Sequence, residues 1–363
     1  MYKEIYDIEN LYLASHNALK GKKSKNSAAR FWLYEDREIL QMQKELKKKS
    51  YIFGGYNSFI LHDNGVDRRI SVAPFRDRVL HHAIMLGIEP LFEKSFIYDS
   101  YANRKGKGTI NALKRARYYA NKYRYVLQLD IQKFFPSIDH EILLAQLSKK
   151  VRCTDTLNLL KNLIANSNRQ DDAYFYFKSD SLFTPYDRKK GIPLGNLTSQ
   201  FFGNLYLNPF DHFVKEELRI KGYIRYVDDT LYFSNSKSFL HGIVEKIKKY
   251  LISLRLKIHP LKIKLLEVAD GFVFLGHKVF KTHFRLTSKA IRRGRKKLKK
   301  ITYDYRYNRV DLARAKNSIF GTIGFFKVGN NAKMIDELLA QTVLKKKPFL
   351  EVVPSGRFVE QQC

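Results

Sequence analysis

Two adjacent acids near the middle of the chain, Asp228 and Asp229, are the residues whose type and spacing first suggest chemistry. Aromatic or apolar residues flank them within residues 222–233, a pattern that predicts two strands joined by a tight turn with both acids at its tip. Adjacent carboxylates repel each other, so a fold that keeps both ionised usually brings a cation to them. Divalent ions such as Mg²⁺ prefer carboxylate oxygens and leave positions open for phosphate oxygens. Because aspartate is also a common turn residue, the pair considered alone favours an ordinary exposed turn.

A third acid, Asp130, lies near the end of residues 125–131, which have the apolar composition of a buried strand. A carboxylate at the end of a core strand loses hydration unless it is paired or bound to metal. Phe135, five residues later, could stack beside whatever that acid binds, although a turn acid followed by a core phenylalanine would give the same pattern. A helix is expected next, with Ser137 or Asp139 as its cap.

The chain as a whole carries a large positive charge. Its 363 residues include 67 Lys and Arg against 35 Asp and Glu, and the formal net charge of +32 indicates a polyanionic partner, most often nucleic acid. An anionic membrane surface is the rival, but the sequence has no run of about 18 apolar residues. Cys153 and Cys363 are too few for a disulfide framework or a zinc site, and the first residues show no apolar signal-peptide core. We therefore expect a cytoplasmic protein with free thiols and no membrane partner.

Two basic segments are candidates for contacts with phosphate groups. Residues 100–109 form a glycine-containing loop before a helix, where Arg104, Lys105 and Lys107 could bind an anion together with backbone N–H groups. Residues 281–300 contain ten Lys or Arg and no acid. Such blocks are often disordered, but apolar and aromatic residues continue beyond this one, so a packed helical domain with a basic face is expected. The nucleic-acid contacts expected on that face are Arg292, Arg293, Arg295, Lys296 and Lys297.

The remaining pattern predicts the elements that must position these groups. Residues 1–50 favour basic helices, and residues 51–75 favour short strands with a hairpin turn at Asn64 and Gly65. A ribbon there would carry Arg68 and Arg69, which could lay guanidinium groups over a triphosphate or simply lie on an exposed edge. A helix is expected from Pro74, with Asp77 in an ion pair, and further helices are expected over 140–166 and 238–254. Residues 191–200 are expected to form a loop that ends at a helix cap, Thr198 or Ser199. Residues 256–264 favour a strand-like segment, and residues 272–280 favour a hairpin. The polar and aromatic insert at 167–190 receives no chemical assignment.

Together these features indicate nucleotidyl transfer on nucleic acid. Two divalent ions held by Asp130, Asp228 and Asp229 could activate a 3′-hydroxyl and stabilise a leaving pyrophosphate. The spacing of the acids alone does not separate a polymerase from a nuclease.

With these motifs in this order, the sequence resembles the reverse transcriptases of the bacterial type. Residues 226–229, Tyr-Val-Asp-Asp, match the Tyr-x-Asp-Asp box of that family, and residues 129–135 match its first metal-ligand motif. The resemblance implies that Asp130 and Asp228 are the main metal ligands, that Ile131 lends its backbone carbonyl, and that Asp229 is a less direct ligand. It implies a two-ion site for Mg²⁺, or Mn²⁺ in its place.

Other residues receive roles from the same resemblance. Phe135 would lie under the sugar and exclude a 2′-hydroxyl, and Arg69 would contact the triphosphate of an incoming dNTP. Residues 259–262 resemble the late lysine motif, which makes Lys262 a nucleotide contact, or Lys264 if the register differs. Residues 274–276 resemble the primer-grip hairpin, and the basic helices after them resemble the thumb.

The resemblance further implies an α+β right-hand polymerase fold, with fingers, a palm built on an antiparallel sheet and a helical thumb. The expected boundaries are a helical N-terminal extension at 1–50, part of the fingers at 51–125, the palm with fingers segments and the 167–190 insert at 126–280, and a basic helical thumb with a C-terminal tail at 281–363.

Residues 192–200 carry a resemblance to one subgroup. Most reverse transcriptases have Gln-Gly-x-x-x-Ser-Pro there, whereas Leu194 replaces the Gln and Gln200 replaces the Pro in this chain. This pattern, like residues 74–78 and 100–108, is similar to the enzymes of diversity-generating retroelements, and it implies that Leu194, Gly195 and Gln200 line the nucleotide site. It implies copying of a template-repeat RNA into cDNA with frequent errors opposite adenine, for protein diversification. The implied partners are template RNA, the cDNA or primer, dNTPs and a small basic accessory protein oligomer, in a bacterial cell whose chromosome or phage encodes the element.

Other interpretations stay open at this point. The chain could be a reverse transcriptase of another bacterial class, either retron-like or anti-phage. It could be a non-catalytic scaffold that binds RNA, although intact Asp130, Asp228 and Asp229 argue against that. The basic run at 281–300 could bind a membrane surface instead of nucleic acid.

Overall fold

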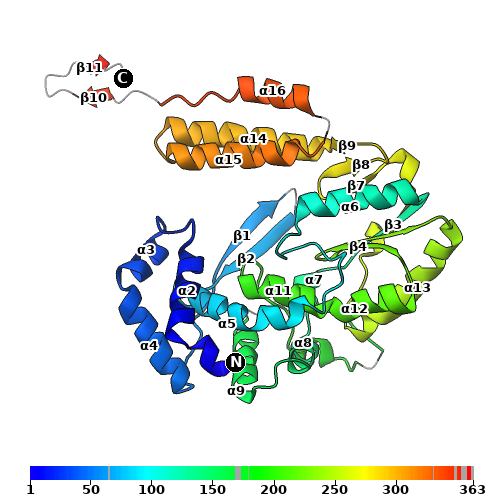
Figure 1. The fold of residues 1–363 in the computed structure, drawn as a ribbon, viewed down its shortest axis with the longest axis horizontal. Coiled ribbons are helices and arrows are strands. Elements are labelled where there is room, and N and C mark those ends of the chain that lie inside the picture. The colour runs from blue at the N-terminus through cyan, green and yellow to red at the C-terminus, as the bar shows by residue number, and fades with distance from the viewer. Residues whose placement is uncertain are drawn as a thin grey trace. The chain divides into compact units, whose positions relative to one another are not determined.

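The computed structural model describes residues 1–63, 66–167, 173–178, 180–329, 331–346, 350–352 and 358–360. The chain divides into two compact units (Figure 1). The first consists of Met1–Gly106 with Leu127–Leu265, and the second of Lys107–Val126 with Leu266–Cys363. Helices and antiparallel strands occur in both units, as the α+β expectation requires. The predicted boundaries of fingers, palm and thumb stay predictions.

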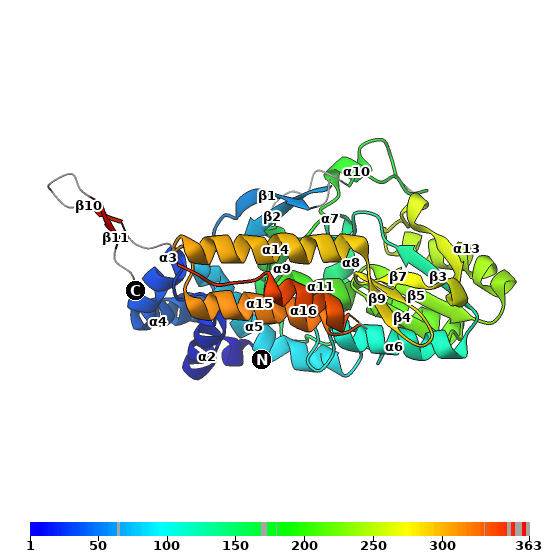
Figure 2. The ribbon, with the colours of Figure 1, turned by 90° about the horizontal axis from the view of Figure 1, so that it is seen from above.

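The N-terminal part of the first unit is helical, as predicted. It contains α1 (Tyr2–Ile5), α2 (Ile8–Leu19), α3 (Asn26–Leu33) and α4 (Glu35–Lys47). The backbone turns at Tyr34, which separates α3 from α4. Leu11, Ala14 and Ala18 of α2 are buried, and α2 packs against α5 (Phe75–Glu93), as Figures 1 and 2 show.

A two-stranded ribbon precedes α5. Strands β1 (Asn57–Asp63) and β2 (Val66–Val72) pair antiparallel as predicted, but residues 51–56 form no strand. The predicted turn at Asn64 and Gly65 lies outside the described residues. The ion pair expected for Asp77 stays a prediction. Its buried carboxylate accepts hydrogen bonds from the Tyr51 hydroxyl (2.7 Å) and the Gly54 amide (2.8 Å).

A four-stranded sheet has the order β4-β5-β3-β6. The strands are β3 (Tyr125–Asp130), β4 (Gly222–Tyr226), β5 (Asp229–Ser234) and β6 (Lys264–Glu267). Strands β4 and β5 form the predicted antiparallel hairpin. The predicted helix over 238–254 is α13 (Lys237–Ser253), which packs against β5.

Short helices connect these strands. They are α7 (Phe134–Ser137), α8 (His140–Ser148), α9 (Thr154–Ala165), α10 (Thr184–Asp187), α11 (Leu197–Tyr206), α12 (Asn208–His212) and the π-helical turn η1 (Phe213–Glu217). Asp139 caps α8 by accepting hydrogen bonds from the amides of Glu141 and Ile142, so this predicted cap is confirmed. The predicted cap of α11 is wrong: its N-cap residue is Asn196, and Thr198 and Ser199 are buried in its first turn.

The second unit combines a helix, a small sheet and a helical layer. Its elements are α6 (Thr109–Lys122), η3 (Val268–Asp270), β7 (Phe272–Phe274), β8 (His277–Val279), β9 (Phe284–Leu286), α14 (Ser288–Arg306), α15 (Leu312–Phe326), α16 (Ala332–Ala340), β10 (Leu350–Val352) and β11 (Phe358–Glu360). Strands β7 and β8 form the predicted hairpin. The basic run folds as the long helix α14, whose residues Leu298 and Ile301 join a core with Ile319, Ile323 and Phe326.

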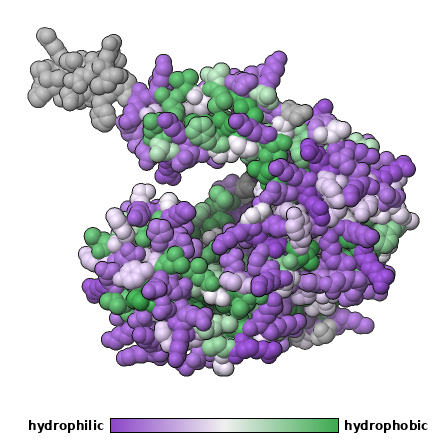
Figure 3. Space-filling model, in the orientation of Figure 1, coloured by the Kyte–Doolittle hydropathy of each residue, from purple (hydrophilic) through white to green (hydrophobic). Residues whose placement is uncertain are grey.

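Hydrophilic residues cover much of the surface visible in Figure 3, with hydrophobic residues between them. Among the helices of the described residues, none combines the length and the apolar character that crossing a bilayer requires.

The contact between α14 and α15 generates a stability prediction. An added Cβ at Gly294 would lie 2.1 Å from the ring of buried Phe326. Gly294→Ala should therefore lower the free energy of unfolding by about 1–3 kcal/mol through overpacking, despite the better helix propensity of alanine. Gly321→Ala in α15 is the matched control, because nothing lies within 4 Å of its added Cβ. It should raise the free energy of unfolding by up to about 1 kcal/mol. Denaturant unfolding followed by circular dichroism measures both, and shifts of the same sign would contradict this packing.

Candidate active site

The hairpin between β4 and β5 has a strained turn. Tyr226 pairs with Asp229 at the end of the ladder, and Val227 between them has a φ of +58°. A β-branched residue rarely adopts this left-handed conformation, which costs of the order of 1–3 kcal/mol. Such a turn persists only where neighbouring groups hold it. The acid that follows, Asp228, is half-buried, and Asp229 is exposed at the start of β5.

Arg225, near the end of β4, stabilises this turn. Its side chain and that of Asp211 in α12 are both 0% exposed and form a bidentate ion pair, with Arg225 Nε 2.7 Å and Nη2 2.6 Å from the carboxylate oxygens. Arg225 Nη1 also donates to the carbonyl oxygen of Val227 at 3.2 Å and to the Asn204 side chain at 3.1 Å. The guanidinium therefore joins the strained turn to α11 and α12.

The backbone around Arg225 is fixed as well. Its amide donates to the carbonyl of Asp99, and its carbonyl accepts from the amide of Tyr101, each at 3.0 Å. The Asn204 amide group donates to the carbonyl of Ala102 at 2.7 Å. The loop that begins the predicted anion-binding segment thus supports the edge of β4.

Asp130 lies at the end of β3, beside the hairpin. The Thr230 hydroxyl donates to the Leu129 carbonyl at 3.1 Å, which ties β5 to β3 just before the acid. One carboxylate oxygen of Asp130 is 2.7 Å from the ammonium nitrogen of Lys262. Lys262 ends the 3₁₀ turn η2 (Pro260–Lys262), whereas Lys264 begins β6, so Lys262 is the lysine that reaches the acid. The strand-like prediction for 256–264 holds at Ile258, which bridges to Ile131, and at Lys264, which begins β6, whereas residues 260–262 form a 3₁₀ turn.

The three predicted catalytic acids lie close enough to change one another's pKa values. Loss of hydration, followed by repulsion from Asp130, raises the pKa of Asp228 to about 6. Loss of hydration and the charges of Asp228 and Asp130 raise the pKa of Asp229 to about 7. Lys262 opposes both shifts. Three carboxylates in this arrangement favour protonation or a bound cation over full ionisation.

The carboxylates of these acids could bind a hard cation only together with other oxygen ligands. Within the described part of the chain, no three His, Cys, Asp or Glu side chains cluster as a ready metal site. Hard divalent ions accept backbone carbonyl and phosphate oxygens as well as carboxylates. The acids of this site, with such oxygens, fit an ion that arrives with a phosphate-bearing substrate. The set of Asp130, Ile131, Asp228 and Asp229 as metal ligands stays a prediction.

Phe135 lies close to α11. An added Cβ at Gly203 would be 3.3 Å from its ring, so a larger residue there would require the ring to shift slightly. Phe135 is half-buried, and its backbone carbonyl accepts from the amide of Ile192 at 3.1 Å. This contact joins the residue predicted to lie under the sugar to the start of the 191–200 loop.

The ribbon of β1 and β2 contacts the 191–200 loop directly. The Ser71 amide donates to the Leu194 carbonyl at 3.1 Å, and Gly195, with a φ of +109°, lies so close to Ile70 that an added Cβ would be 3.2 Å from it. The side chain of Leu194 is half-buried, and that of Gln200 is exposed. Asn196 adds hydrogen bonds to the backbone of Ser71 and Ala73.

The structure favours Arg68 where the sequence favoured Arg69. Successive side chains of a strand point to opposite faces, so Arg68 shares the face of Ile70, which meets the loop at Gly195. The positive charge of Arg68 also lowers the pKa of Asp228, against the larger effects that raise it. Arg69 is exposed on the other face of β2, and its contact with a triphosphate stays a prediction.

Arg104 is placed differently from the other predicted basic contacts. Its side chain is 7% exposed, and its guanidinium contacts Glu93 (2.8 Å) and donates to the carbonyls of Ile97 and Ser100. The expectation that it binds nucleic acid is therefore corrected, because its donors support the loop. Lys105 is exposed and Lys107 half-buried. In the second unit, Arg292, Arg293, Arg295, Lys296 and Lys297 are exposed on α14, as predicted for a basic face.

Sequence reasoning missed Arg225, Asp211 and Asn204. The available signal was the arginine itself, since a charged residue inside the apolar run of a core strand needs a buried acid as partner. No local pattern identifies which acid that is.

Comparisons with known proteins identify the family of the chain. The sequence model of the family described as "Reverse transcriptase (RNA-dependent DNA polymerase)" matches residues 47–279. Protein YkfC of Escherichia coli strain K12 is 24% identical over 265 residues, which cover 62% of this chain and 67% of that protein. The group II intron-encoded protein LtrA of Lactococcus lactis is 24% identical over 147 residues, which cover 40% of this chain and 23% of that protein.

The solved structures to which this chain is similar include a telomerase from Candida tropicalis in complex with a fragment of telomeric RNA. It has a TM-score of 0.49 and 12% identity, with coverage of 83% of this chain and 57% of that one. The chain therefore spans about two thirds of YkfC and smaller shares of the other two proteins. The predicted right-hand polymerase fold is confirmed by the family match together with the observed helices and antiparallel sheet.

The buried ion pair generates a prediction. Arg225→Met should lower the free energy of unfolding by about 3–5 kcal/mol, because it leaves the charge of Asp211 buried without its partner. The control is Lys248→Met in α13, whose pair with Glu245 is exposed and should change stability by no more than about 1 kcal/mol. Denaturant unfolding measures both variants, and equal effects would contradict the role given to Arg225.

Proposed function

The chain belongs to the reverse transcriptase family, and from this premise we propose that it is an RNA-directed DNA polymerase that extends a primer with dNTPs on an RNA template. The observation that carries the proposal is the convergence of three acids from two adjacent strands, at an end of the sheet where Lys262 and Arg68 supply positive charge. Converging carboxylates with neighbouring cations suit a triphosphate and its metal ions.

Different residues of the chain would bind the metal ions and the phosphate groups. The carboxylates of Asp130 and Asp228, with the carbonyl of Ile131, would hold two divalent ions, and Asp229 would support them. When bound, Mg²⁺ or Mn²⁺ supplies the charge that activates the primer hydroxyl and neutralises the leaving pyrophosphate. Lys262 would exchange its contact with Asp130 for one with a phosphate oxygen. The Lys262 side chain is 53% exposed, so this exchange would not disturb the core.

Other side chains would select the nucleotide. The ring of Phe135 would lie under the sugar and exclude a 2′-hydroxyl, and Arg68 or Arg69 would contact the triphosphate from the β1–β2 ribbon. The basic face of α14, with Lys105 and Lys107, would contact the nucleic-acid backbone and make binding dependent on salt.

We further propose that the enzyme serves a diversity-generating retroelement. It would copy a template-repeat RNA with frequent errors opposite adenine, in company with a small basic accessory protein oligomer. The departure at Leu194 and Gln200 motivates this proposal. The contact of the Leu194 carbonyl with β2 supports it, because a side chain at this position would lie beside the ribbon predicted to hold the triphosphate. An aliphatic side chain cannot offer the hydrogen bonds of a glutamine amide to the nucleotide.

The alternatives differ in partners rather than in chemistry. A retron-like or anti-phage reverse transcriptase would keep the three acids and use another RNA, so the genomic neighbourhood discriminates. Two near-identical repeats that differ mainly at adenines would favour the retroelement. A non-catalytic RNA-binding scaffold would show no synthesis in any form.

Primer extension tests the proposed activity. With an RNA template, a DNA primer, dNTPs and Mg²⁺, the intact chain should synthesise DNA. Asp228→Asn should reduce the rate by about a thousandfold, the scale of several kcal/mol of lost transition-state stabilisation. Asp270→Asn, which changes an exposed acid of η3, is the control and should retain activity. Absence of synthesis by the intact chain, or equal rates for the two variants, would contradict the proposal.

The error spectrum tests the role of Leu194. Leu194→Gln should lower misincorporation opposite adenine by about tenfold, the effect of one polar constraint worth roughly 1.4 kcal/mol. Leu197→Gln, a nearby exposed position at the start of α11, serves as control and should leave the spectrum unchanged. Sequencing of the cDNA products gives the rates by template base. Unchanged errors opposite adenine in Leu194→Gln would rule out this explanation of infidelity.

A further inference from the structure

The insert at 167–190, described for residues 167, 173–178 and 180–190, is fastened to the start of α8. Lys190 forms an antiparallel bridge with Asp139, and the His140 amide donates to the Lys189 carbonyl at 3.0 Å. Beyond the insert, the Gly191 amide donates to the Ile138 carbonyl at 2.7 Å. The returning chain is therefore aligned with the segment that follows Asp130 and Phe135.

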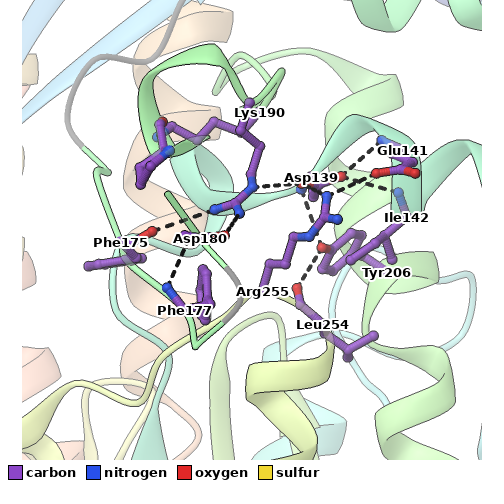
Figure 4. Close-up of polar contacts among 12 residues, drawn as sticks. Asp139, Glu141, Ile142, Phe175, Phe177, Asp180, Lys190, Tyr206, Leu254 and Arg255 are labelled. Atoms are coloured by element: carbon purple, nitrogen blue, oxygen red, sulfur yellow. Dashed lines mark hydrogen bonds and ion pairs between the residues drawn. The ribbon is translucent and has the colours of Figure 1, made fainter. Parts of the chain in front are cut away.

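A buried carboxylate joins the insert to the segment after α13. Asp139 is 1% exposed, and one of its oxygens lies 2.6 Å from Arg255 and 3.7 Å from Arg188 of the insert. Arg188 also pairs with Asp180, whose carboxylate accepts from the Phe177 amide at 2.8 Å. Figure 4 shows Arg255 pointing toward Asp139 and Glu141, with Asp180 and Phe177 on the insert beside them. Each buried acid thus has an arginine partner, as burial of charge requires.

Two aromatic rings of the insert contact the same segment. The ammonium group of Lys257 lies 5.4 Å from the ring centre of Phe175 and 5.5 Å from that of Phe177. Tyr176 between them is 44% exposed, and its hydroxyl donates to the Leu182 carbonyl within the insert. The alternation places Phe175 and Phe177 on Lys257 and leaves Tyr176 outside this contact.

The backbone of residues 255–259 continues this contact to the catalytic acid. The Gln132 amide donates to the Lys257 carbonyl, and the His259 amide donates to the Asp130 carbonyl, both at 2.8 Å. Ile258 bridges to Ile131 between them. Residues 255–259 are therefore held through their side chains by the insert and through their backbone by the residues around Asp130.

We propose that the insert is a positioning element for the catalytic centre. By holding Arg255 and Lys257, it fixes the register of residues 255–262 against Asp130 and Ile131, and thereby the place of Lys262. This inference rests on the proposed polymerase function for its catalytic consequence, but the positioning itself is independent of activity. Phe175, Phe177 and Arg188 act through Lys257 and Arg255 and touch no reacting atom.

Hydrogen–deuterium exchange of the full chain tests the positioning directly. The double variant Phe175→Leu/Phe177→Leu keeps apolar side chains but removes both cation–π contacts. Peptides containing the Gln132 and His259 amides should then exchange about 5- to 30-fold faster, while peptides of α5 and α14 remain unchanged. Tyr176→Leu is the matched control and should leave all four regions unchanged. Equal exchange at Gln132 and His259 in the double variant and the native chain would overturn the proposal.

Kinetics and a double-mutant cycle test the coupling to catalysis. The double variant should lower kcat/KM for dNTP by about 3- to 10-fold without changing the affinity for template-primer. Lys257→Met should have the same effect, Lys257→Arg should restore most of the activity, and adding Lys257→Met to the double variant should cost nothing further. Additive losses would overturn the proposal. If the native chain makes no DNA, the polymerase proposal fails, while the exchange experiment still decides whether the insert positions Asp130.

Discussion

The buried ion pair between Arg225 and Asp211 is the interaction on which the β4–β5 hairpin depends. Both side chains are fully buried, which is unfavourable unless the charges are paired and hydrogen-bonded. The pair satisfies this condition, and the guanidinium group also donates to the carbonyl of Val227, which is in its left-handed conformation. One interaction in the core thus stabilises a turn whose local sequence is unfavourable for it, and the turn presents the two acids.

A second constraint is the repulsion among the acids that this turn brings to Asp130. Burial and mutual charge raise the pKa values of Asp228 and Asp229. Lys262 pairs with Asp130, and Arg68 adds positive potential from the ribbon. In the proposed function, metal ions and phosphate groups would replace these side-chain cations. The net charge of +32 suits the polyanionic partner that the proposal requires.

Two sets of contacts connect the acids to other segments of the chain. The 191–200 loop is hydrogen-bonded to β2 through Leu194 and Asn196. The insert contacts residues 255–259, whose backbone is hydrogen-bonded to the residues around Asp130. Both connections join segments that are far apart in the sequence. They explain how residues without chemistry of their own, such as Gly195 and Phe177, bear on the geometry of the acids.

Local pattern was enough for the elements and the acids: the hairpin with Asp228 and Asp229, the strand ending at Asp130, the Asp139 cap and the helix α14 all follow from periodicity, turn chemistry and charge. The partners of the charged side chains depended on tertiary packing. The pairs of Arg225 with Asp211, Arg104 with Glu93, and Lys262 with Asp130 could not be inferred from spacing. The physical reason is that periodicity encodes which face of an element is buried, whereas an ion pair depends on which distant element is packed against that face.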